Sequence, residues 1–350
     1  MENTRDCKFD VIKGFTIILV VLGHVIQRNI VSYESNIAFL IIYSFHMPLF
    51  MYISGYITYG RVGFNKKEWL LNKFSILIIP FFSWMLLSYV LSFLTIFGIY
   101  PPYTIVSGGI IHYIAYTIIH PNNGLWFLWA LFGIYIPFLF AQKLEIWFRD
   151  FAYLITAALL SVILIPPFSS YRFWFGLNYI QYYFVFFTAG YLIAKHQIDW
   201  IRVIKYFEII SLLLFPVLLF FWIKLYPLQS FIGHAVESNL APLLALIYQY
   251  TLGFTGIFFV VYLFSHINYR SLNILAWLGT ITLNIYAAHI PFLKLLHGNS
   301  IVSVITSTLT VLLLAIFVSY LISNVSPINK VFFGKDSKFE LPRFYRRFNT

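Results

Sequence analysis

The chain has 350 residues, of which 61% are hydrophobic and only 10% are charged. A water-soluble domain usually has about a quarter charged residues, so this composition excludes a soluble globule and indicates a protein of the bilayer. The single cysteine, Cys7, excludes an internal disulfide framework and a cysteine-based zinc cluster. The formal charge of +11 lies in short segments between apolar runs, which favours membrane topology over nucleic-acid binding as its cause.

Apolar runs of membrane-spanning length follow one another along the chain. A spanning helix needs about 20 mostly apolar residues, and we predict an all-α, polytopic membrane helix bundle of about ten transmembrane helices. A shorter run over residues 104–120 contains glycines and is expected to lie on the outer surface or to re-enter. The predicted spans are Val11–Arg28, Ile37–Gly60, Phe74–Tyr100, Gly124–Ala141, Phe151–Pro167, Tyr179–Ala194, Tyr206–Tyr226, Leu240–Phe264, Ile274–His297 and Ser300–Ser323.

The distribution of basic residues predicts the orientation of the chain. Cytoplasmic loops retain Lys and Arg, and an inner N-terminus with ten spans puts 18 of the 23 Lys and Arg residues on the inner side. We therefore expect a multi-pass protein of the inner (cytoplasmic) membrane with both termini in the cytoplasm. Residues 1–330 are predicted to form one transmembrane domain, and residues 331–350 a basic cytoplasmic tail.

The first apolar run carries two basic side chains on one helical face. Lys13 and His24 are eleven residues apart, which is close to three helical turns and about 16 Å along the axis. Asp10, three residues before Lys13, is placed to pair with it. Ionisable groups at membrane depth are costly, and their presence indicates function. The competing interpretations are a snorkelling anchor for Lys13 and a histidine bonded to a neighbouring helix for His24.

Two further histidines are expected at a similar depth. With the predicted topology, His46 and His289 fall with His24 in the outer half of the bilayer. Histidine accepts a proton near neutral pH, so this group suits general-base chemistry on a hydroxyl, and it suits equally a proton relay in a transporter. No two of the three histidines have the i, i+3 or i+4 spacing of a helical metal site, and we expect no metal.

Other residues within the apolar runs are weaker candidates for substrate binding. Ser54 and the glycine after it allow close backbone approach, although such residues more often pack helices together. Trp126 opens a predicted outer helix end, where it is either a belt residue of the membrane interface or a platform for a sugar ring. Asn284 lies off the helical face of His289 and can bond a neighbouring helix. The candidate substrate site therefore comprises His46, Ser54, Trp126, Asn284 and His289.

A basic segment follows the second predicted span. Its four cations lie on the predicted inner side, where such charges fix topology and attract anionic lipid. They can also form a cationic funnel for a phosphorylated cytoplasmic ligand. The candidate residues for binding such a ligand are Arg61, Lys66, Lys67 and Lys73.

Several motifs occur in the order known from one membrane enzyme family. RDCKFDVIKGFTIILVVLGH, with Lys13 and His24, resembles the first-helix signature of the membrane acyltransferase-3 family and is closest to its fucose 4-O-acetylase-like branch. FHMPLFMYISGY resembles the second helix of that family, NNGLWFLWALF its tryptophan segment, FFTAGYLIA its glycine helix and TLNIYAAHIPF its late Ser-Leu-x-Ile-Tyr-x-x-His element. The landmarks run from about Arg5 to His289, so the resemblance covers most of the chain.

The resemblance implies transfer of an acyl group, usually acetyl from cytoplasmic acetyl-CoA, across the membrane to a hydroxyl, commonly of a surface polysaccharide. It implies His24 as the catalytic histidine and Lys13 as its basic partner. Imidazole can act as a base or carry the acyl group, and the sequence leaves both open. The expected partners are acetyl-CoA as acyl donor, membrane lipid and a surface glycan or lipid-linked oligosaccharide, with no permanently bound cofactor and no nucleic acid.

The sequence departs from the family pattern in two places. Many relatives have two arginines, with two residues between them, where the third helix begins, and this chain has Lys73 and then Ile76. The second cation is therefore missing, and Lys66 and Lys67 are the residues that can replace it. The late element has Thr282 where serine is usual.

The sequence leaves more than one class of function open. The leading hypothesis is a membrane O-acyltransferase that acts on an envelope polysaccharide or its lipid-linked precursor. The alternative is a secondary transporter or lipid-linked glycan flippase, which buried histidines and proline-broken helices would also suit, although the two halves show no internal repeat. A structural scaffold would not explain Lys13 and His24 on one face. The acceptor sugar and the length of the acyl chain are not determined by the sequence.

Overall fold

The computed structural model describes residues 7–63, 65–92, 109–121, 124–162, 173–198, 200–226, 241–293 and 298–335. Over these ranges all regular structure is helical, which confirms the all-α prediction. Short 3-10 turns occur at Tyr33–Ser35, Trp174–Gly176, Tyr269–Ser271 and Ile290–Phe292. The thirteen α-helices of this part are α1 (Cys7–Asn29), α2 (Ile37–Thr58), α3 (Lys66–Ser92), α5 (Gly109–Ile119), α6 (Trp126–Phe148), α7 (Phe151–Ser161), α8 (Leu177–Lys195), α9 (Trp200–Lys224), α11 (Ala241–Ser265), α12 (Asn273–Thr280), α13 (Thr282–Ala288), α14 (Ile301–Ser323) and α15 (Ser326–Phe333).

Six of the described helices are long and apolar enough to cross a membrane, namely α1, α2, α3, α6, α11 and α14. Shorter apolar helices are α5, α7 and the part of α9 from Ser211 to Lys224. The protein is therefore a polytopic membrane helix bundle, as its composition predicted. The uncertain run over residues 104–120 contains α5, and its first residues, 104–108, lie outside the described residues.

The predicted span Ile274–His297 is not one continuous helix. Ile281 separates α12 from α13 with φ −109° and ψ 16°, which are not helical angles. The Thr282 hydroxyl donates to the carbonyl oxygen of Gly279 at 2.9 Å, a local bond that competes with helix continuation. Apolar composition predicts the length of such a segment but not its interruption. As a result, His289 follows a helix of only 7 residues inside the bundle.

Two helix pairs approach so closely that only glycine fits between them. A Cβ on Gly14 of α1 would lie 1.9 Å from the carbonyl oxygen of Leu275 in α12. A Cβ on Gly55 of α2 would lie 1.8 Å from the carbonyl oxygen of Phe187 in α8, and Gly190 of α8 is just as close to α2. The close backbone approach expected at Gly55 is thus confirmed, and it fixes the position of α2 in the bundle.

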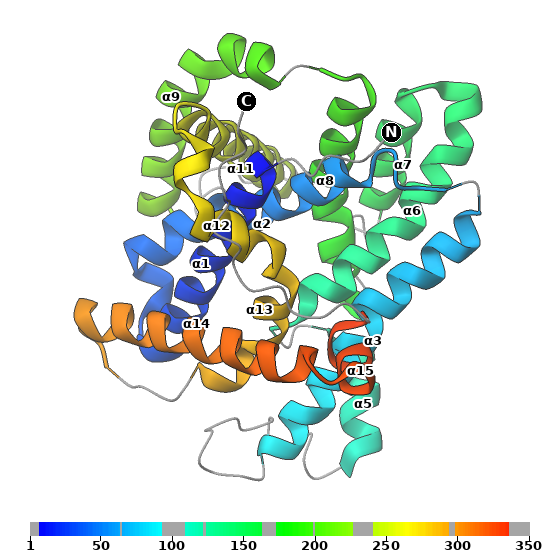
Figure 1. Cartoon of the computed structure of the whole chain (residues 1–350). Coiled ribbons are helices and arrows are strands. Elements are labelled where there is room, and N and C mark those ends of the chain that lie inside the picture. The colour runs from blue at the N-terminus through cyan, green and yellow to red at the C-terminus, as the bar shows by residue number, and fades with distance from the viewer. Residues whose placement is uncertain are drawn as a thin grey trace, which may run out of the picture.

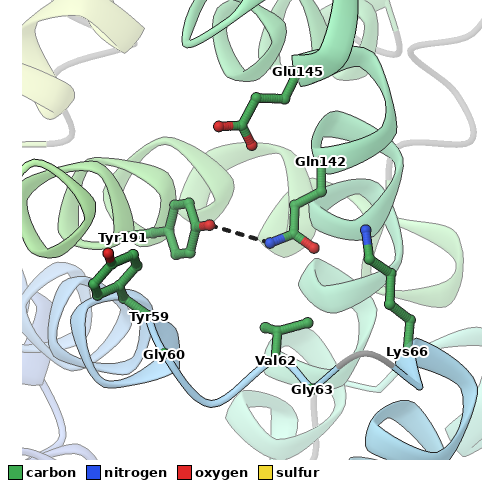
Figure 2. A pocket seen from close by; sticks show the side chains of 8 residues that line it. All are labelled: Tyr59, Gly60, Val62, Gly63, Lys66, Gln142, Glu145 and Tyr191. Carbon is green, nitrogen blue, oxygen red and sulfur yellow. Dashed lines mark hydrogen bonds between the residues drawn. The ribbon is translucent and has the colours of Figure 1, made fainter.

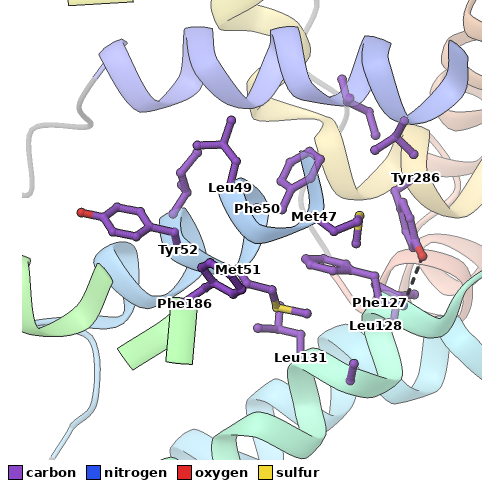
Figure 3. Close-up of a cluster of buried hydrophobic side chains, with 14 of the residues drawn as sticks. Met47, Leu49, Phe50, Met51, Tyr52, Phe127, Leu128, Leu131, Phe186 and Tyr286 are labelled. Carbon is purple, nitrogen blue, oxygen red and sulfur yellow. Dashed lines mark hydrogen bonds between the residues drawn. The ribbon is translucent and has the colours of Figure 1, made fainter. Parts of the chain in front are cut away.

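In Figure 3, α2 lies between α1 and α6, and the helix that packs most extensively against α2 is α8 (Figure 1). Apolar side chains of α2 and α6 interdigitate there, and Figure 3 shows Phe186 of α8 and Tyr286 of α13 reaching the same cluster. Leu49, Met51 and Leu128 are completely shielded from solvent. This packing holds α1, α2 and α13 in a fixed relation. His24 lies on α1, His46 lies on α2, and His289 directly follows α13.

The last described helix, α15, packs against α3. The indole N–H of Trp84 donates to the carbonyl oxygen of Phe332 at 2.9 Å, and Phe333 is buried. The predicted boundary between membrane domain and tail, at residue 330, falls within this helix. Residues 336–350 of the predicted tail lie outside the described residues, so the division into domains stays a prediction.

Candidate active site

Lys13 and His24 lie on one unbroken helix, α1. Its continuity over Cys7–Asn29 puts the two side chains on one face, about three turns apart. The expected ion pair with Asp10 is confirmed, since Lys13 Nζ lies 2.7 Å from Asp10 Oδ1. Asp10 is buried and Lys13 keeps 18% of its side chain exposed. The cation therefore comes with its own counter-ion, which lowers the cost of placing it within the bundle.

His24 is held by an amide that sequence analysis did not single out. Its Nδ1 lies 3.2 Å from the side-chain oxygen of Gln27, one helical turn further along α1. An amide oxygen only accepts hydrogen bonds, so Nδ1 carries the proton and Nε2 carries the lone pair. The hydroxyl of Tyr43 donates to the same oxygen at 3.3 Å. Gln27 thus fixes both the orientation and the tautomer of His24. The sequence could have predicted this contact, because Gln27 is three residues after His24 and side chains at that spacing lie side by side on a helix.

His289 lies against His24, with their ring centroids 5.2 Å apart. The Nδ1–H of His289 donates to the carbonyl oxygen of Tyr286 at 2.7 Å, which again leaves the lone pair on Nε2. This Nε2 is buried and has no hydrogen-bond partner within the described part of the chain. An unsatisfied buried acceptor costs about 1–3 kcal/mol. A hydroxyl donor brought by a substrate would remove that cost.

His46 joins the other two histidines through Tyr43. Its Nδ1–H donates to the carbonyl oxygen of Ile42 at 2.7 Å, and its ring lies 4.8 Å from that of Tyr43. Because Tyr43 also bonds Gln27, the structure links His46 to His24 through two side chains. The three histidines predicted at one depth therefore lie in one region, and we call them the histidine group. Their catalytic and substrate roles stay predictions.

Trp126 belongs to a stack of three aromatic rings. Its ring stacks on Tyr179 at 4.4 Å and on Tyr183 at 5.3 Å, both at an interplanar angle of 24°. The two tyrosines are four residues apart on α8 and so share one helical face. We call these three side chains the aromatic wall. Sequence analysis named only Trp126, because tyrosines are too frequent in this chain for two of them to stand out.

A hydrogen-bonded tyrosine connects the start of α6 to the histidine group. The Tyr286 hydroxyl donates to the carbonyl oxygen of Gly124 at 2.8 Å and accepts from the Phe127 N–H at 3.2 Å. Its ring lies 5.7 Å from that of His289. Gly124 has φ +80°, a left-handed conformation that favours glycine. The glycine at this position therefore favours the turn that precedes Trp126. Tyr286 thereby places the aromatic wall near the histidines.

Ser54 and Asn284 have partners elsewhere. The Ser54 hydroxyl donates to the carbonyl oxygen of Phe50 at 2.8 Å, and Ser54 is two turns, about 12 Å, along α2 from His46. Asn284 donates to the Ser323 hydroxyl of α14 at 3.3 Å, which is the bond to a neighbouring helix expected for it. Their assignment to a substrate site is not supported by these contacts and stays a prediction.

The candidate cations gather where α2 ends and α3 begins. Arg61 and Lys67 are exposed, and Lys66 is half-buried. Lys73 lies over the rings of Trp69 at 5.4 Å and Tyr135 at 5.5 Å, two cation–π contacts. The start of α1 is close to this end of the bundle, since the rings of Phe9 and Tyr56 are 4.3 Å apart. The cations and Lys13 therefore share one end, opposite His24 along α1.

The ends of α6 and α8 at this same side form an ion-paired cluster. Lys195 contacts Glu145 and lies 2.5 Å from Asp150, and His196 Nε2 lies 2.7 Å from the other oxygen of Asp150. The hydrogen bond from Lys195 holds the pKa of Asp150 below its ordinary value. The Tyr153 hydroxyl donates to Glu145 at 2.7 Å. The carboxylates here are matched by cations.

Among the described residues, no three His, Cys, Asp or Glu side chains are grouped to hold a metal ion. The arrangement that the histidine group does offer is a pair of oriented imidazoles with lone pairs on Nε2. Such a pair can accept a proton from a hydroxyl and return it to a leaving group.

Comparison with known proteins identifies the family. A family model described as an acyltransferase domain matches residues 8–324. Nodulation protein NolL of Sinorhizobium fredii (strain NBRC 101917 / NGR234) is 31% identical over 200 residues, which is 55% of this chain and 50% of that protein. Nodulation protein NolL of Mesorhizobium japonicum (strain LMG 29417 / CECT 9101 / MAFF 303099) is 30% identical over 207 residues, 57% of this chain and 50% of that protein.

The aligned part spans about half the length of these relatives. No solved structure matches the chain. The family model, in contrast, covers the helices that carry Lys13, His24, His46 and His289. The chain therefore belongs to the acyltransferase-3 family and is a multi-pass membrane protein.

Proposed function

We propose that this acyltransferase moves an acetyl group from cytoplasmic acetyl-CoA to a hydroxyl of a cell-surface polysaccharide or its lipid-linked precursor. The observation that carries the proposal is the pairing of His24 with His289, whose ring centroids are 5.2 Å apart. Both imidazoles are fixed through Nδ1, and the lone pair of His289 Nε2 is buried without a partner in the described structure. Proton transfer from an alcohol requires such an oriented imidazole with a lone pair on Nε2.

In the proposed step, His24 acts as the general base. Its Nε2 takes the proton of the acceptor hydroxyl while the hydroxyl oxygen attacks the thioester carbonyl carbon. The C–S bond then breaks, and the imidazolium returns the proton to the thiolate leaving group. The Gln27 oxygen stabilises the imidazolium through Nδ1–H, and His289 Nε2 accepts a hydrogen bond from a neighbouring hydroxyl of the acceptor, which orients the acceptor.

The aromatic wall suits the acceptor glycan. Sugar rings present apolar C–H faces, and these pack on flat aromatic surfaces such as Trp126 with Tyr179 and Tyr183 beside it. Through Tyr286 this wall lies next to His289. A sugar resting on the wall would therefore bring one of its hydroxyls to the histidine group.

The opposite end of α1 suits the donor. The candidate cations attract the phosphates of acetyl-CoA, and the distance of about 16 Å between Lys13 and His24 is left for the extended thioester arm. Since cytoplasmic loops are rich in Lys and Arg, we assign this end and both termini to the cytoplasm, and the chain to the inner membrane. The transporter alternative is not retained, because the family model that matches the chain describes an acyltransferase domain.

The test is acetyl transfer by the purified protein in proteoliposomes. Labelled acetyl-CoA is supplied with a de-O-acetylated surface polysaccharide, and label in the polysaccharide is counted. We expect His24→Ala to lower the rate by about 100-fold or more, the usual contribution of a general base. The matched control is His266→Ala, a histidine at the exposed end of α11. Equal rates for His24→Ala and the native protein would refute the proposal.

A second readout separates base from acyl carrier. Donor alone, without acceptor, is mixed rapidly with the native protein, and the protein is examined for covalently bound label. A general base leaves no labelled histidine, whereas an acyl-carrying His24 gives about one label per chain before turnover. Label on His24 would replace the base role by the carrier role and leave the overall reaction unchanged.

A further inference from the structure

Tyr43 of α2 contacts α1 at the turn that contains His24. A Cβ on Gly23 would lie 2.9 Å from Cε2 of Tyr43, so a larger residue there would displace the tyrosine ring. Gln27 lies four residues after Gly23 and therefore on the same face of α1. The Tyr43 hydroxyl donates to Gln27 Oε1 at 3.3 Å, and the Nδ1–H of His24 donates to the same oxygen at 3.2 Å. One amide oxygen thus joins a tyrosine of α2 to the candidate catalytic histidine.

The ring of Tyr43 is held in place by its neighbours. It stacks on Phe39, with the ring centroids 3.9 Å apart at an interplanar angle of 29°, and lies 4.8 Å from the ring of His46. Phe39 is four residues before Tyr43, so the two rings are supported by the same face of α2. Gly23 borders the ring on the α1 side. The hydroxyl has no hydrogen-bond partner other than Gln27 within the described residues.

The orientation of the Gln27 amide decides which nitrogen of His24 carries the proton. The two ends of an amide group have nearly the same shape, but the oxygen only accepts hydrogen bonds and the NH2 group only donates them. A neutral imidazole has one N–H and one lone pair. If the NH2 group of Gln27 faced His24, Nδ1 would have to accept, and the proton would lie on Nε2. His24 could then not accept a proton through Nε2.

A glutamine beside a tyrosine can adopt the opposite orientation, as a second pair shows. At the other end of the bundle Gln142 lines the cavity where α2, α6 and α8 end, and its amide nitrogen donates to the Tyr191 hydroxyl at 3.2 Å (Figure 2). Tyr43 differs because its hydroxyl gives its proton to the glutamine oxygen. If the Gln27 amide were turned round, that proton would lose the acceptor it has, which is unfavourable for a group inside the bundle.

We infer that Tyr43 is a positioning residue. Its hydroxyl holds the Gln27 amide in the orientation that keeps the proton of His24 on Nδ1 and the lone pair on Nε2. The inference rests on the proposed function, in which Nε2 of His24 takes the proton of the acceptor hydroxyl. Tyr43 itself takes no part in the transfer. Loss of its hydroxyl should therefore leave substrate binding intact and reduce the fraction of His24 that can act as a base.

The test removes the Tyr43 hydroxyl in two backgrounds. Gln27→Glu replaces the amide by a carboxylate, whose two oxygens both accept, so that neither rotation favours the wrong tautomer. In the native background Tyr43→Phe should lower kcat in proteoliposomes by roughly 2- to 12-fold, the effect of one lost hydrogen bond, with the KM for donor and acceptor unchanged. In the Gln27→Glu background Tyr43→Phe should not lower kcat further. Equal losses in both backgrounds would overturn the inference, because the hydroxyl would then act through packing or substrate contact.

The matched control is Tyr191→Phe, which removes a tyrosine hydroxyl that is bonded to a glutamine at the other end of the bundle. This variant should leave both kcat and the tautomer of His24 unchanged. A loss of kcat equal to that of Tyr43→Phe would mean that losing any such bond loosens the bundle, and it would also overturn the inference.

A spectroscopic readout tests the inference independently of activity. The protein is labelled with ¹⁵N in its histidine rings and placed in nanodiscs, where NMR distinguishes protonated from unprotonated ring nitrogens. The signals of His24 are identified by their absence in His24→Ala. Nδ1 should be protonated in the native protein, the two tautomers should be mixed in Tyr43→Phe, and Nδ1 should be protonated again when Gln27→Glu is added.

Two results separate the failure of this inference from that of the proposed function. If His24 keeps its proton wholly on Nδ1 in Tyr43→Phe, the inference is wrong, whatever the rate of acetyl transfer. If the tautomer changes as expected in a protein that transfers no acetyl, the proposed function is wrong and the positioning role of Tyr43 stands.

Discussion

The histidine group and the opposite end of the bundle use different kinds of polar chemistry. The hydrogen-bond partners of His24, His46 and His289 are one side-chain amide and two backbone carbonyl groups. At the other end, Lys195 and His196 meet carboxylates in an ion-paired cluster. Uncharged hydrogen-bond partners leave imidazoles free to exchange a proton, whereas cations suit the binding of an anionic donor. The proposed function therefore assigns proton transfer to one end and donor binding to the other.

The largest effect should come from breaking the histidine pair. His289→Ala should lower the rate about 10-fold or more, His24→Ala by about 100-fold or more, and the double variant by no more than His24→Ala alone. The reason is that His289 accepts a hydrogen bond from a neighbouring hydroxyl of the acceptor and so orients the reacting hydroxyl, whose proton only His24 takes. Turnover with saturating donor and acceptor is the measurement.

The double variant decides between one catalytic unit and two separate contributions. Losses that multiply would mean that the two imidazoles act independently, and the pairing at 5.2 Å would then be incidental. His46→Ala serves as the comparison within the histidine group, because His46 is linked to His24 through Tyr43 and Gln27, whereas the ring of His289 lies directly against that of His24. We expect a smaller loss for His46→Ala than for His289→Ala.

Neutralising the donor end should act on binding and not on the chemical step. Glutamine at Arg61, Lys66, Lys67 and Lys73 together should raise the KM for acetyl-CoA about 10-fold or more, with little change in KM for the glycan, since charged hydrogen bonds contribute about 1.5–3 kcal/mol each. The effect should shrink at high salt, where exposed charges are screened. Initial rates at two ionic strengths measure it.

The control for this variant uses cations at the opposite end. Arg28 ends α1 beyond His24, and Lys224 ends α9. Glutamine at both positions should leave the KM for acetyl-CoA unchanged. If the KM for acetyl-CoA rises equally in the two variants, the basic segment does not bind the donor specifically and serves only net charge and topology.

The aromatic wall should give a smaller effect, confined to the acceptor. Trp126→Ala should raise the KM for the glycan about 2- to 10-fold, because aromatic contacts of this kind contribute about 0.5–1.5 kcal/mol. Trp126→Phe should restore part of the loss. Trp147→Ala, at the exposed far end of the same helix, is the control and should change nothing. A donor KM that rises with Trp126→Ala would contradict the separation of the two ends.

Sequence analysis predicted the class of fold and named the three histidines as candidates at a similar depth. It did not predict the hydrogen bonds and contacts that orient them. Hydropathy gives helix length, and the eleven-residue spacing fixes the shared face of Lys13 and His24 once α1 is continuous. The contact of His24 with His289 depends on the bend at Ile281, which is a tertiary property. Nothing in a run of apolar residues marks such a bend.

The parts that sequence analysis missed are those made of common residue types. Gln27, Tyr43 and Tyr286 orient the histidines through hydrogen bonds that join α1, α2, α6 and α13. A tyrosine in a chain with 26 of them carries no positional signal. The cavity beside Gln142 was equally invisible, because three helix ends meet there only after folding.

The smallest expected effect is that of Asp150→Asn, in the ion-paired cluster, on the stability of the folded protein. Hydrogen bonding to Lys195 lowers the pKa of Asp150 below its ordinary 3.8 in the folded protein. The stabilisation is therefore fully present above that ordinary value and is lost as the pH falls through the lowered one. Because Asp150 is 41% exposed, Asp150→Asn should cost at most about 1 kcal/mol at pH 7.

Thermal unfolding in detergent between pH 3 and pH 7 measures this loss. The native protein should have the higher Tm at pH 7, and the two curves should converge as acid protonates Asp150. The control is Glu34→Gln, an exposed carboxylate beyond the far end of α1 whose removal should leave the Tm unchanged. Because the histidine group bonds through uncharged partners, its activity at pH 7 should be unaffected by Asp150→Asn. A lower turnover in that variant would show that the two ends of the bundle are coupled.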